Sequence, residues 1–386
     1  MNSTTVDTAD AAHWDAIVIG AGPAGCMAAR SIALRGKSVL LVDRATFPRD
    51  KVCGCCVNTA AVDQLHRAGL GRAIMAGRPL RVFELRVNGR CCVLQLPPGI
   101  AISRALLDGE LMKAAVEAGA VFRPSTLARV GQIAGDHRCV RLVEHERETA
   151  VAARVVVVAD GLSGGALADL ADIEVVVRPR SRMGAAAILD GAMDAYVSGT
   201  IYMACGRGGY VGAVRLEDGR LNLAAAFDPS LMDRIGGPGR AAVGVLSAAG
   251  CPIPSGLEDA RWRGTPLLSR RLKRPASKRV FVVGDAAGYV EPFTGEGIAW
   301  ALAGGVRAGE FALRAVEHWQ DSLAAQWTAA HRSMIGRRQL VCRAARLIVH
   351  RPWAAEMLTV GLNIAPRLFN LVADIMRTPY PSERRP

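Results

Sequence analysis

The sequence predicts an α/β protein: a parallel sheet flanked by helices, an inserted antiparallel sheet and a helical C-terminal tail. Three observations support this fold class. An apolar, β-branched run at 14–20 leads into a glycine-rich turn and a helix, two similar runs at 154–162 and 279–288 end beside an aspartate, and stretches of alternating polarity lie between them. Continuous apolar runs are typical of parallel strands buried on both faces, whereas alternation indicates a sheet with one solvated face.

The composition is that of a globular protein with a sizeable core. The chain has 386 residues, of which 51% are hydrophobic and 22% charged, so we expect more than one structural part. We recognise no secretory signal, because the polar N-terminus lacks an apolar segment, and glycines break the apolar run at 16–34. The 10 cysteines lack even spacing, which suggests reduced thiols and a cytoplasmic protein.

The net charge of +13 would suit a nucleic acid or an anionic surface. The arginines, however, are spread along the whole chain, and no basic patch interleaved with aromatic residues is present in the sequence. We therefore expect an enzyme that binds phosphate groups and a small molecule, and no nucleic-acid partner.

The first candidate site is the turn GAGPAG at residues 20–25, between a predicted strand and a predicted helix over 26–35. Gly20 permits the tight turn, Gly22 lets the backbone approach a pyrophosphate, and Gly25 lets the helix pack on the strand. The start of the helix offers free N–H groups and a partial positive charge to phosphates. The pattern predicts a dinucleotide site; the alternative is a glycine-rich turn that binds nothing.

An acidic residue supports the dinucleotide interpretation. The next predicted strand, SVLLV at 38–42, closes with Asp43, at the spacing where a carboxylate accepts hydrogen bonds from the ribose hydroxyls. Arg44 follows directly and could instead meet a 2′-phosphate.

Two later predicted strands also end at an aspartate. The predicted strands at 154–162 and 279–288 end in an aspartate beside a glycine, and the alternative role for these aspartates is capping of a turn. The segment YVEPFTGEGIAWALA at 289–303 then forms a loop that opens into a helix near Ile298. Such a helix start can set N–H dipoles against a phosphate or an anionic ring edge.

In this order and at these separations, GAGPAG, ADG and GDAAGYVEPFTGEGI resemble the FAD-dependent oxidoreductases of the aromatic-hydroxylase fold. The match is closest to their geranylgeranyl-reductase-like branch, which also contains hydroxylases and halogenases. PFTGEGI is similar to that branch, and so is KVCG at 51–54, where the family commonly reads K-x-C-G-G. The resemblance covers roughly residues 14–330 and implies a Rossmann-type FAD-binding domain.

The resemblance also implies roles for individual residues. The glycine turn would hold the FAD pyrophosphate with Arg104, Asp43 would hold the adenosine ribose, Asp160 would lie near the pyrophosphate and nicotinamide path, and Asp285 would bind the ribityl chain. The loop before Ile298 would approach the flavin ring. The predicted cofactor-binding residues are Gly20, Gly22, Pro23, Ala24, Gly25, Asp43, Arg44, Cys53, Gly54, Arg104, Asp160, Gly161, Gly284, Asp285, Pro292, Gly295, Glu296, Gly297 and Ile298.

The stretch KVCGCCV places three thiols, Cys53, Cys55 and Cys56, within four residues. A zinc site needs about four ligands, often in paired blocks, and no partner block follows, so we expect no metal. A redox disulfide is a second alternative, although no second nucleotide fold accompanies it. The favoured interpretation is that the three thiols line the flavin, where Cys53 would tune its electronics or donate a proton. The remaining alternative is that all three pack as small hydrophobic residues.

The alternating stretches at 80–100 and 182–227 predict an antiparallel sheet that roofs the flavin, with a hairpin turn at Asp218-Gly219. Prenyl reductases carry an aromatic Y-x-W-x-F-P motif where this chain reads GYVGAVRL, and only Tyr210 remains of those aromatic residues. Tyr210 is therefore the second candidate catalytic residue after Cys53; the alternative is ordinary packing within the sheet.

The tail at 327–376 has apolar stripes at helical spacing with arginines between them, divided by Pro352 and Pro366. In the resembled reductases such a tail closes a lipid pocket or touches a membrane, and peripheral membrane contact is one expectation here; the other is a solvated helical cap. We thus expect an FAD-binding domain built from 13–79, 101–180 and 276–325, a substrate domain built from 80–100 and 181–275, and a helical region at 326–386.

The sequence favours an FAD-dependent monooxygenase that takes electrons from transiently bound NAD(P)H and hydroxylates an apolar or aromatic, polyketide-like substrate. This preference rests on the loss of the reductase aromatic motif. The first alternative is a geranylgeranyl-reductase-like enzyme that reduces isoprenoid C=C bonds, supported by PFTGEGI and the helical tail. A flavin-dependent halogenase, although its usual W-x-W-x-I-P pattern is missing, and a flavin-binding module without turnover are the others. In each enzyme the cofactor supplies the redox chemistry and the protein positions the substrate.

Overall fold

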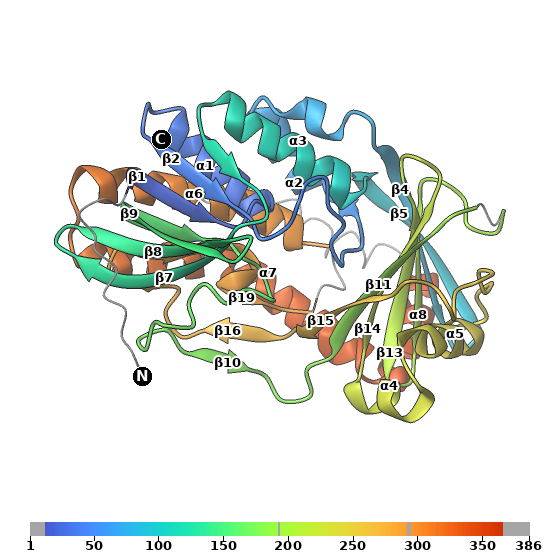
Figure 1. Cartoon of the computed structure of the whole chain (residues 1–386). Coiled ribbons are helices and arrows are strands. Elements are labelled where there is room, and N and C mark those ends of the chain that lie inside the picture. Colours follow the sequence, from blue (N-terminus) through green and yellow to red (C-terminus); the bar gives the residue numbers. More distant parts are fainter. Residues whose placement is uncertain (1–11, 192–193, 292–294, 366–386) are drawn as a thin grey trace.

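A parallel sheet with helices on one face forms one half of the molecule (Figure 1). The structure, a computed structural model, describes residues 12–191, 194–291 and 295–365. The strands of this first sheet, in spatial order, are β17 (Ala276–Ser277), β18 (Val280–Val282), β9 (Arg147–Val158), β1 (Ala12–Ile19), β2 (Val39–Val42) and β6 (Val121–Arg123). All neighbours are parallel except β17 and β18. The predicted parallel sheet is therefore confirmed.

The central strand β1 is buried on both faces, as its continuous apolar run predicts. Ala16 and Val18 face a core shared with the helices, while Ile17 and Ile19 face a second core. The helices on the first face are α1 (Pro23–Ala33), α2 (Thr59–Arg67), α3 (Arg104–Glu117) and α6 (Gly297–Glu317). The hairpin of β7 (Leu127–Ala134) and β8 (His137–Glu144), which pairs with β9, contributes to the second core.

A second sheet of eight strands forms the other half. In spatial order its strands are β15 (Arg263–Leu267), β11 (Met183–Leu189), β14 (Leu221–Phe227), β13 (Gly209–Arg215), β12 (Thr200–Gly206), β4 (Arg78–Val87), β5 (Arg90–Ala101) and β3 (Cys56–Val57). The predicted hairpin between β13 and β14 is confirmed, and Gly219 has φ +86° in its turn. The helices α4 (Pro229–Ile235) and α5 (Pro238–Ala249) pack beside this sheet.

One pair in the second sheet departs from the predicted antiparallel order. β12 and β4 are parallel, with Tyr202 opposite Glu84. These two strands come from the two separate segments of the predicted substrate domain, so no hairpin joins them and their direction is free to be parallel. The alternating pattern in the sequence predicts the exposed and buried faces of a strand, but not the direction of its neighbour.

Several short elements were not predicted. A small sheet of β10 (Val175–Val177), β16 (Arg270–Leu272) and β19 (Gly288–Tyr289) lies between the two halves. The structure also has two 3₁₀ helices, η2 (Gly71–Ile74) and η3 (Gly284–Ala286). The predicted strand at 279–288 is correspondingly shorter, because η3 and β19 occupy its second half.

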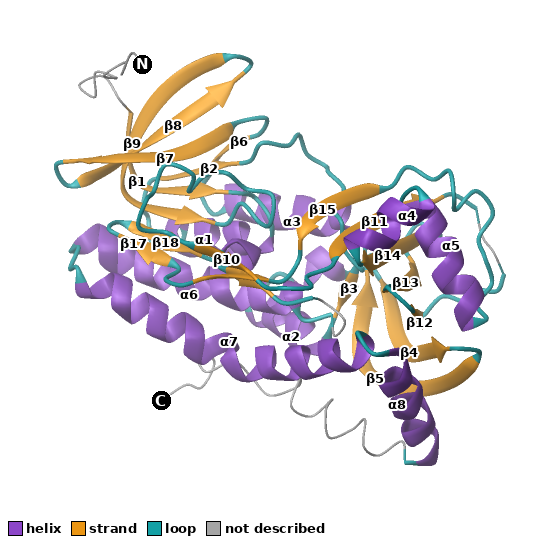
Figure 2. Cartoon of the chain, turned by 90° about the horizontal axis from the view of Figure 1, so that it is seen from below, coloured by secondary structure: helices purple, strands orange, loops and turns teal. Residues whose placement is uncertain are grey.

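The tail forms two helices, α7 (Ser322–Val349) and α8 (Pro352–Ile364), with Pro352 at the start of the second as predicted. Figure 2 shows α7 running from the first half of the molecule toward the second sheet, where α8 contacts β4 and β5. The part of the predicted tail after residue 365, with Pro366, lies outside the described residues. Across the described ranges no helix has both the length and the apolar character needed to cross a membrane. Contact with a membrane surface stays a prediction.

Candidate cofactor and substrate site

A cavity of about 1150 Å³ extends from the glycine turn after β1 to the second sheet and the helices α7 and α8. Of the predicted cofactor-binding residues that the structure describes, all line this cavity except Gly25, which lies beneath the turn. Pro292 lies outside the described residues. The cavity thus joins residues from segments more than 250 positions apart, as the resemblance implied, while the roles of these residues toward FAD stay predictions.

The glycine turn is open toward the cavity and tightly packed on its other side. Gly20 has φ +102°, a conformation that favours glycine. A Cβ atom at Gly25 would lie 1.7 Å from the Gly20 carbonyl oxygen, so this position requires glycine for packing. A Cβ at Gly22 would meet nothing closer than 3.7 Å, at the guanidinium of Arg49. Because α1 has no side-chain cap, its first N–H groups are available to a ligand at Gly22.

Two arginines face this turn, and one of them was not predicted. The guanidinium of Arg104 donates to both carboxylate oxygens of Asp108, at 2.9 and 2.8 Å, and Arg49 approaches the same carboxylate at 3.2 Å. Asp108 is fully buried. The shared carboxylate holds both guanidinium groups in place beside Gly22, where their N–H groups could donate to a diphosphate.

Asp43 stands at the end of β2, as predicted, and lines the cavity. Its carboxylate accepts a hydrogen bond from the Ala21 N–H at 2.8 Å and one from the Ala45 N–H at 2.9 Å, so the side chain has a fixed orientation. Arg44 is exposed and donates to the Ser163 carbonyl oxygen at 3.2 Å.

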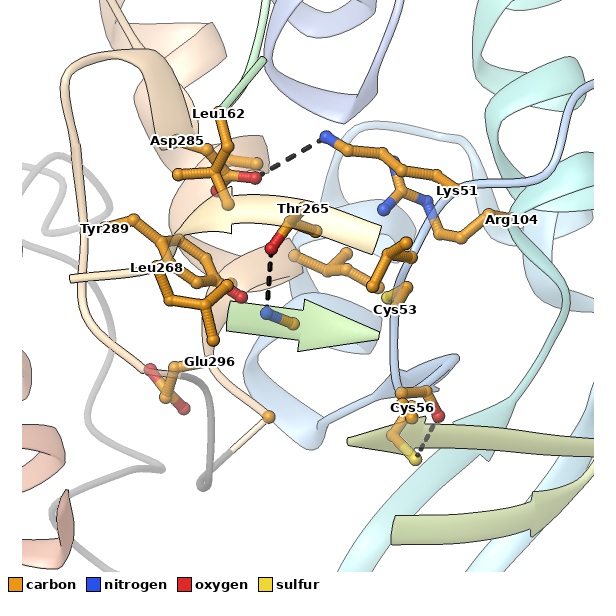
Figure 3. A pocket seen from close by; sticks show the side chains of 18 of the residues that line it. Lys51, Cys53, Cys56, Arg104, Leu162, Thr265, Leu268, Asp285, Tyr289 and Glu296 are labelled. Atoms are coloured by element: carbon orange, nitrogen blue, oxygen red, sulfur yellow. Dashed lines mark hydrogen bonds and ion pairs between the residues drawn. The ribbon is translucent and has the colours of Figure 1, made fainter. Parts of the chain in front are cut away.

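The two other strand ends place their aspartates in the wall of the same cavity. Asp160 accepts from the Ala166 N–H at 3.0 Å, and burial raises the pKa of its carboxyl above the usual value. Asp285 forms an ion pair with Lys51 at 3.5 Å, which Figure 3 shows across the cavity wall. Lys51 therefore connects the segment KVCGCCV to the third anchor, a contact between residues 234 positions apart.

The three thiols of KVCGCCV have different surroundings. The Cys53 sulfur accepts from the Cys55 N–H at 3.4 Å, and hydrogen bonding with Cys55 together with the charge of Arg104 lowers the pKa of the Cys53 thiol to about 5. The hydrogen bond with Cys53, together with burial, raises the pKa of Cys55, and burial raises that of Cys56 to about 12. In Figure 3 Cys53 lies near Arg104, whereas Cys56 points away and contacts the Gly54 carbonyl oxygen.

Cys53 is therefore a thiolate at neutral pH, while Cys55 and Cys56 remain thiols. A thiolate cannot donate a proton, so of the two roles predicted for Cys53, tuning of a nearby cofactor is the one that its protonation state permits. Among the described residues, no group of three His, Cys, Asp or Glu side chains is arranged to hold a metal ion. Cys91 and Cys92 lie on β5.

The second sheet and the C-terminal helices line the apolar arm of the cavity. We use this name for the part lined by Leu80, Phe83, Leu85, Leu94, Met203, Ala213, Val341, Ala345, Ile348, Val349, Leu358 and Leu362. Tyr210, on β13, also lines the cavity and is almost fully buried, with the guanidinium of Arg182 at 5.8 Å from its ring centre. Burial raises the pKa of the Tyr210 phenol, and likewise that of Tyr289, which lines the cavity near Asp285.

The donor set fits an FAD molecule. The open face of Gly22, the uncapped start of α1 and the guanidinium groups of Arg49 and Arg104 suit a diphosphate, and the oriented carboxylate of Asp43 suits a ribose. The first turn of α6 contributes Gly297, which lines the same cavity nearer the apolar arm. A flat ring system between this turn and Cys53 would then face the substrate part of the cavity.

Sequence reasoning missed several residues of the site. Asp108 is four positions after Arg104 on a predicted helix, a spacing that puts both side chains on one face, so this partner was detectable. Lys51 stands within the quoted thiol stretch, but its partner Asp285 comes from a distant segment and no local pattern announces the pair. The same holds for Arg49, whose contacts with Asp43 and Asp108 depend on how the segments pack.

The chain matches the sequence profile of the family described as "FAD binding domain" over residues 13–310. Among curated proteins, it is 28% identical over 328 residues to digeranylgeranylglycerophospholipid reductase 2 of Methanopyrus kandleri, covering 79% of this chain and 78% of that protein. It is 27% identical to conditioned medium factor receptor 1 of Dictyostelium discoideum, covering 76% of this chain but 62% of that protein. A shorter match of 36% identity to menaquinone reductase of Mycobacterium tuberculosis covers 38% of this chain and 37% of that one.

Solved structures share the fold over almost the whole chain. The flavin-dependent brominase Bmp2 has a TM-score of 0.76 at 15% identity, covering 94% of this chain and 92% of the brominase. The p-nitrophenol 4-monooxygenase PnpA from Pseudomonas putida has a TM-score of 0.74 at 14% identity, covering 95% and 98%. A geranylgeranyl bacteriochlorophyll reductase-like protein from Thermoplasma acidophilum has 0.71 at 19%, covering 90% and 91%. At these identities the similarity establishes the fold alone.

Proposed function

The chain belongs to the FAD-binding domain family and is a flavin-dependent oxidoreductase, and from this premise we propose that it reduces carbon–carbon double bonds of a long apolar substrate with electrons from NAD(P)H. The observation that carries the proposal is the continuity of the cavity. One space runs from the diphosphate-binding turn past the start of α6 into the apolar arm. A chain-like apolar molecule in that arm would present one of its bonds to the flavin ring.

The similarity to curated proteins supports reduction over the other reactions of the fold. A reductase of digeranylgeranylglycerophospholipids aligns over about four-fifths of both chains. The menaquinone reductase match is higher in identity but spans less than two-fifths of that protein. Monooxygenation is supported by the missing aromatic motif, but the alignment with a reductase over most of the chain favours reduction.

The protein would contribute binding, orientation and proton placement, while FAD supplies the two-electron chemistry. The turn at Gly22, with Arg104, would hold the diphosphate, and the helices α7 and α8 would exclude water from the apolar arm. Reduction of a double bond also needs a proton at one of the two carbons. The phenol oxygens of Tyr210 and Tyr289 keep their protons at neutral pH because burial raises their pKa, so each can deliver one.

Monooxygenation is the second candidate function. Its specific support is that Tyr210 alone remains of the aromatic motif found in prenyl reductases. In that case the same arm would hold an aromatic or polyketide-like substrate, and Arg104, Cys53 and the start of α6 would keep the roles given above. A halogenase would require halide in addition to oxygen.

One product analysis distinguishes these functions. Purified protein loaded with FAD is incubated with NADPH and geranylgeranyl diphosphate or a geranylgeranylated glycerolipid, once without oxygen and once in air. Products that gain two hydrogen atoms per double bond and no oxygen atom establish reduction. A product that gains one oxygen atom, and forms only in air, establishes monooxygenation. Protein that stays colourless with excess FAD contradicts both, and a flavin that NADPH does not bleach indicates a module without turnover.

A further inference from the structure

Two glutamates on either side of residues 292–294 are almost fully buried. Glu291 and Glu296 are each 1% exposed. A buried carboxylate is unfavourable unless it is paired and hydrogen-bonded, so the partners of these side chains fix where Glu291 and Glu296 themselves lie. Glu296 directly precedes α6, whose start is expected beside the flavin ring.

Glu296 connects three helices. Its Oε1 atom accepts a hydrogen bond from the side-chain amide of Asn58 at 2.6 Å, and Asn58 in turn caps α2. Its Oε2 atom accepts from the Trp300 indole N–H at 3.0 Å and from Arg338 at 2.7 Å. Burial raises the pKa of Glu296, and the charge of Arg338 opposes this effect. The guanidinium of Arg338, on α7, is itself only 5% exposed, so this is a buried ion pair.

The carboxylate of Glu291 is also bound by side chains at the end of α7. Its Oε2 atom lies 2.8 Å from Nε2 of His350, the C-cap residue of α7, and 3.6 Å from Nε of Arg346 in the last turn of that helix. Its Oε1 atom accepts from Arg182 at 3.2 Å, and Arg182 also pairs with Asp228 at 3.1 Å. Glu291 therefore links α7 to the second sheet.

Between these two attachments α7 lines the apolar arm. Arg338 and His350 are 12 positions apart, roughly 18 Å along the helix axis. The stretch that separates them supplies Val341, Ala345 and Ile348 to the cavity wall. One helix, with its C-cap residue, thus contacts the substrate part of the cavity and holds the buried carboxylates of Glu296 and Glu291.

We propose that α7 positions the start of α6 against the flavin ring, with Arg338 as the positioning residue through Glu296 and His350 as its counterpart through Glu291. The inference rests on the proposed flavin site and adds residues that would not contact the cofactor themselves. Nothing in the local sequence marks Arg338, because its role depends on a partner 42 positions earlier in the chain.

The physical consequence concerns the charge of the reduced flavin. The start of α6 carries no side-chain cap, so its partial positive charge is free to act on a neighbouring anion. Gly297, Ile298 and Ala301 of its first turns line the cavity. Loosening Glu296 would let this helix end move, and the effect would be larger on the anionic reduced flavin than on the neutral oxidised one.

The test is the two-electron reduction potential of FAD-loaded Arg338→Met, with its visible spectrum. We expect the variant to bind reduced FAD about tenfold more weakly relative to oxidised FAD, which corresponds to a potential lower by about 30 mV. Arg338→Lys, which keeps the charge, should recover part of this difference. Glu296→Gln combined with Arg338→Met removes both charges of the ion pair, so this double variant should fold even where the buried charge of Glu296 destabilises the single variant, and it should show the same lower potential.

Arg332→Met is the matched control. Arg332 also lies on α7, but it is exposed and donates to the Lys273 carbonyl oxygen at 2.9 Å, away from the cavity. The reduction potential of FAD bound to the Arg332→Met variant should equal that of FAD bound to the unmodified protein. If the double variant binds FAD with unchanged potential and spectrum, the positioning role is wrong while the flavin site stands. If the unmodified protein binds no FAD, the proposed function fails and the inference with it.

Discussion

Arg104 and Cys53 both line the cavity, where hydrogen bonding with Cys55 and the positive charge of Arg104 together lower the pKa of the Cys53 thiol. The arginine starts α3 and the cysteine follows β2, so the pair joins the predicted diphosphate end to the predicted ring end of the cofactor site. Because Asp108 holds the guanidinium in place, the thiolate keeps a fixed cationic neighbour. The protonation state of Cys53 therefore reports whether the guanidinium of Arg104 lies beside its sulfur.

The pH dependence of Cys53 alkylation should reveal its thiolate. In flavin-free protein treated with iodoacetamide, labelling of Cys53 should be constant between pH 6 and 8 and fall below a midpoint near pH 5, because the thiolate is the reactive form. Peptide mass spectrometry measures the rate. Cys56 serves as the internal control, since its pKa of about 12 should leave it unlabelled at neutral pH. A Cys53 rate that rises steeply between pH 8 and 9 would contradict the prediction.

Alanine substitutions at Gly22 and Gly25 should separate the two roles of the glycine turn, which are diphosphate binding at Gly22 and packing of α1 on β1 at Gly25. Gly22→Ala should fold normally but bind FAD roughly tenfold more weakly, a loss of about 1.4 kcal/mol, because the new Cβ occupies space needed by the diphosphate. Gly25→Ala should fail to fold stably, since its Cβ would overlap the Gly20 carbonyl. Thermal unfolding and flavin titration measure the two effects.

Gly109→Ala is the control for these substitutions. Gly109 lies within α3, and a Cβ there would meet no atom within 4 Å. Alanine should therefore stabilise the protein by about 0.5–1 kcal/mol, the usual helix preference, and leave FAD affinity unchanged. Equal flavin affinity in the Gly22 and Gly109 variants would rule out the diphosphate role of the turn.

Removal of Asp108 should be strongly destabilising. Asp108→Ala leaves two arginine charges, those of Arg49 and Arg104, without their shared buried partner, and breaking a buried ion pair from one side costs about 3–5 kcal/mol. Urea unfolding measures the loss. Glu110→Ala, on the same helix, removes an ion pair with the exposed Lys113 and should change stability by less than about 1 kcal/mol. A similar loss of unfolding free energy in both variants would show that the buried ion pairs of Asp108 contribute no more than an exposed one.

A bulky residue in the apolar arm should block the substrate without disturbing the cofactor. Ala345→Phe projects a ring into the arm from α7, so we expect unchanged FAD affinity and at least a tenfold loss of NADPH-dependent product formation, about 1.4 kcal/mol of transition-state binding. Leu347→Phe, two positions on, is 53% exposed and should behave like the unmodified enzyme. Full activity of the Ala345 variant would place the substrate elsewhere in the cavity.

The sequence by itself determined the features whose cause is local. The positive φ of Gly20, the close packing at Gly25, the hairpin at Gly219 and the carboxylate at the end of β2 each follow from the residue and its neighbours, and the structure has them where the spacing predicts. The motifs at the three strand ends of the parallel sheet, in their order along the chain, resemble those of FAD-dependent oxidoreductases, and this resemblance indicated the fold and the cofactor.

Only the tertiary structure decided which distant residues meet. Lys51 with Asp285, Arg338 with Glu296 and the parallel pairing of β12 with β4 join segments that no local pattern relates. A pattern of apolar and polar residues reports that a side chain is buried, but not what lies opposite it. The lowered pKa of Cys53 likewise depends on the fold, because it needs both the local hydrogen bond with Cys55 and the guanidinium of Arg104 that the packing of α3 brings near.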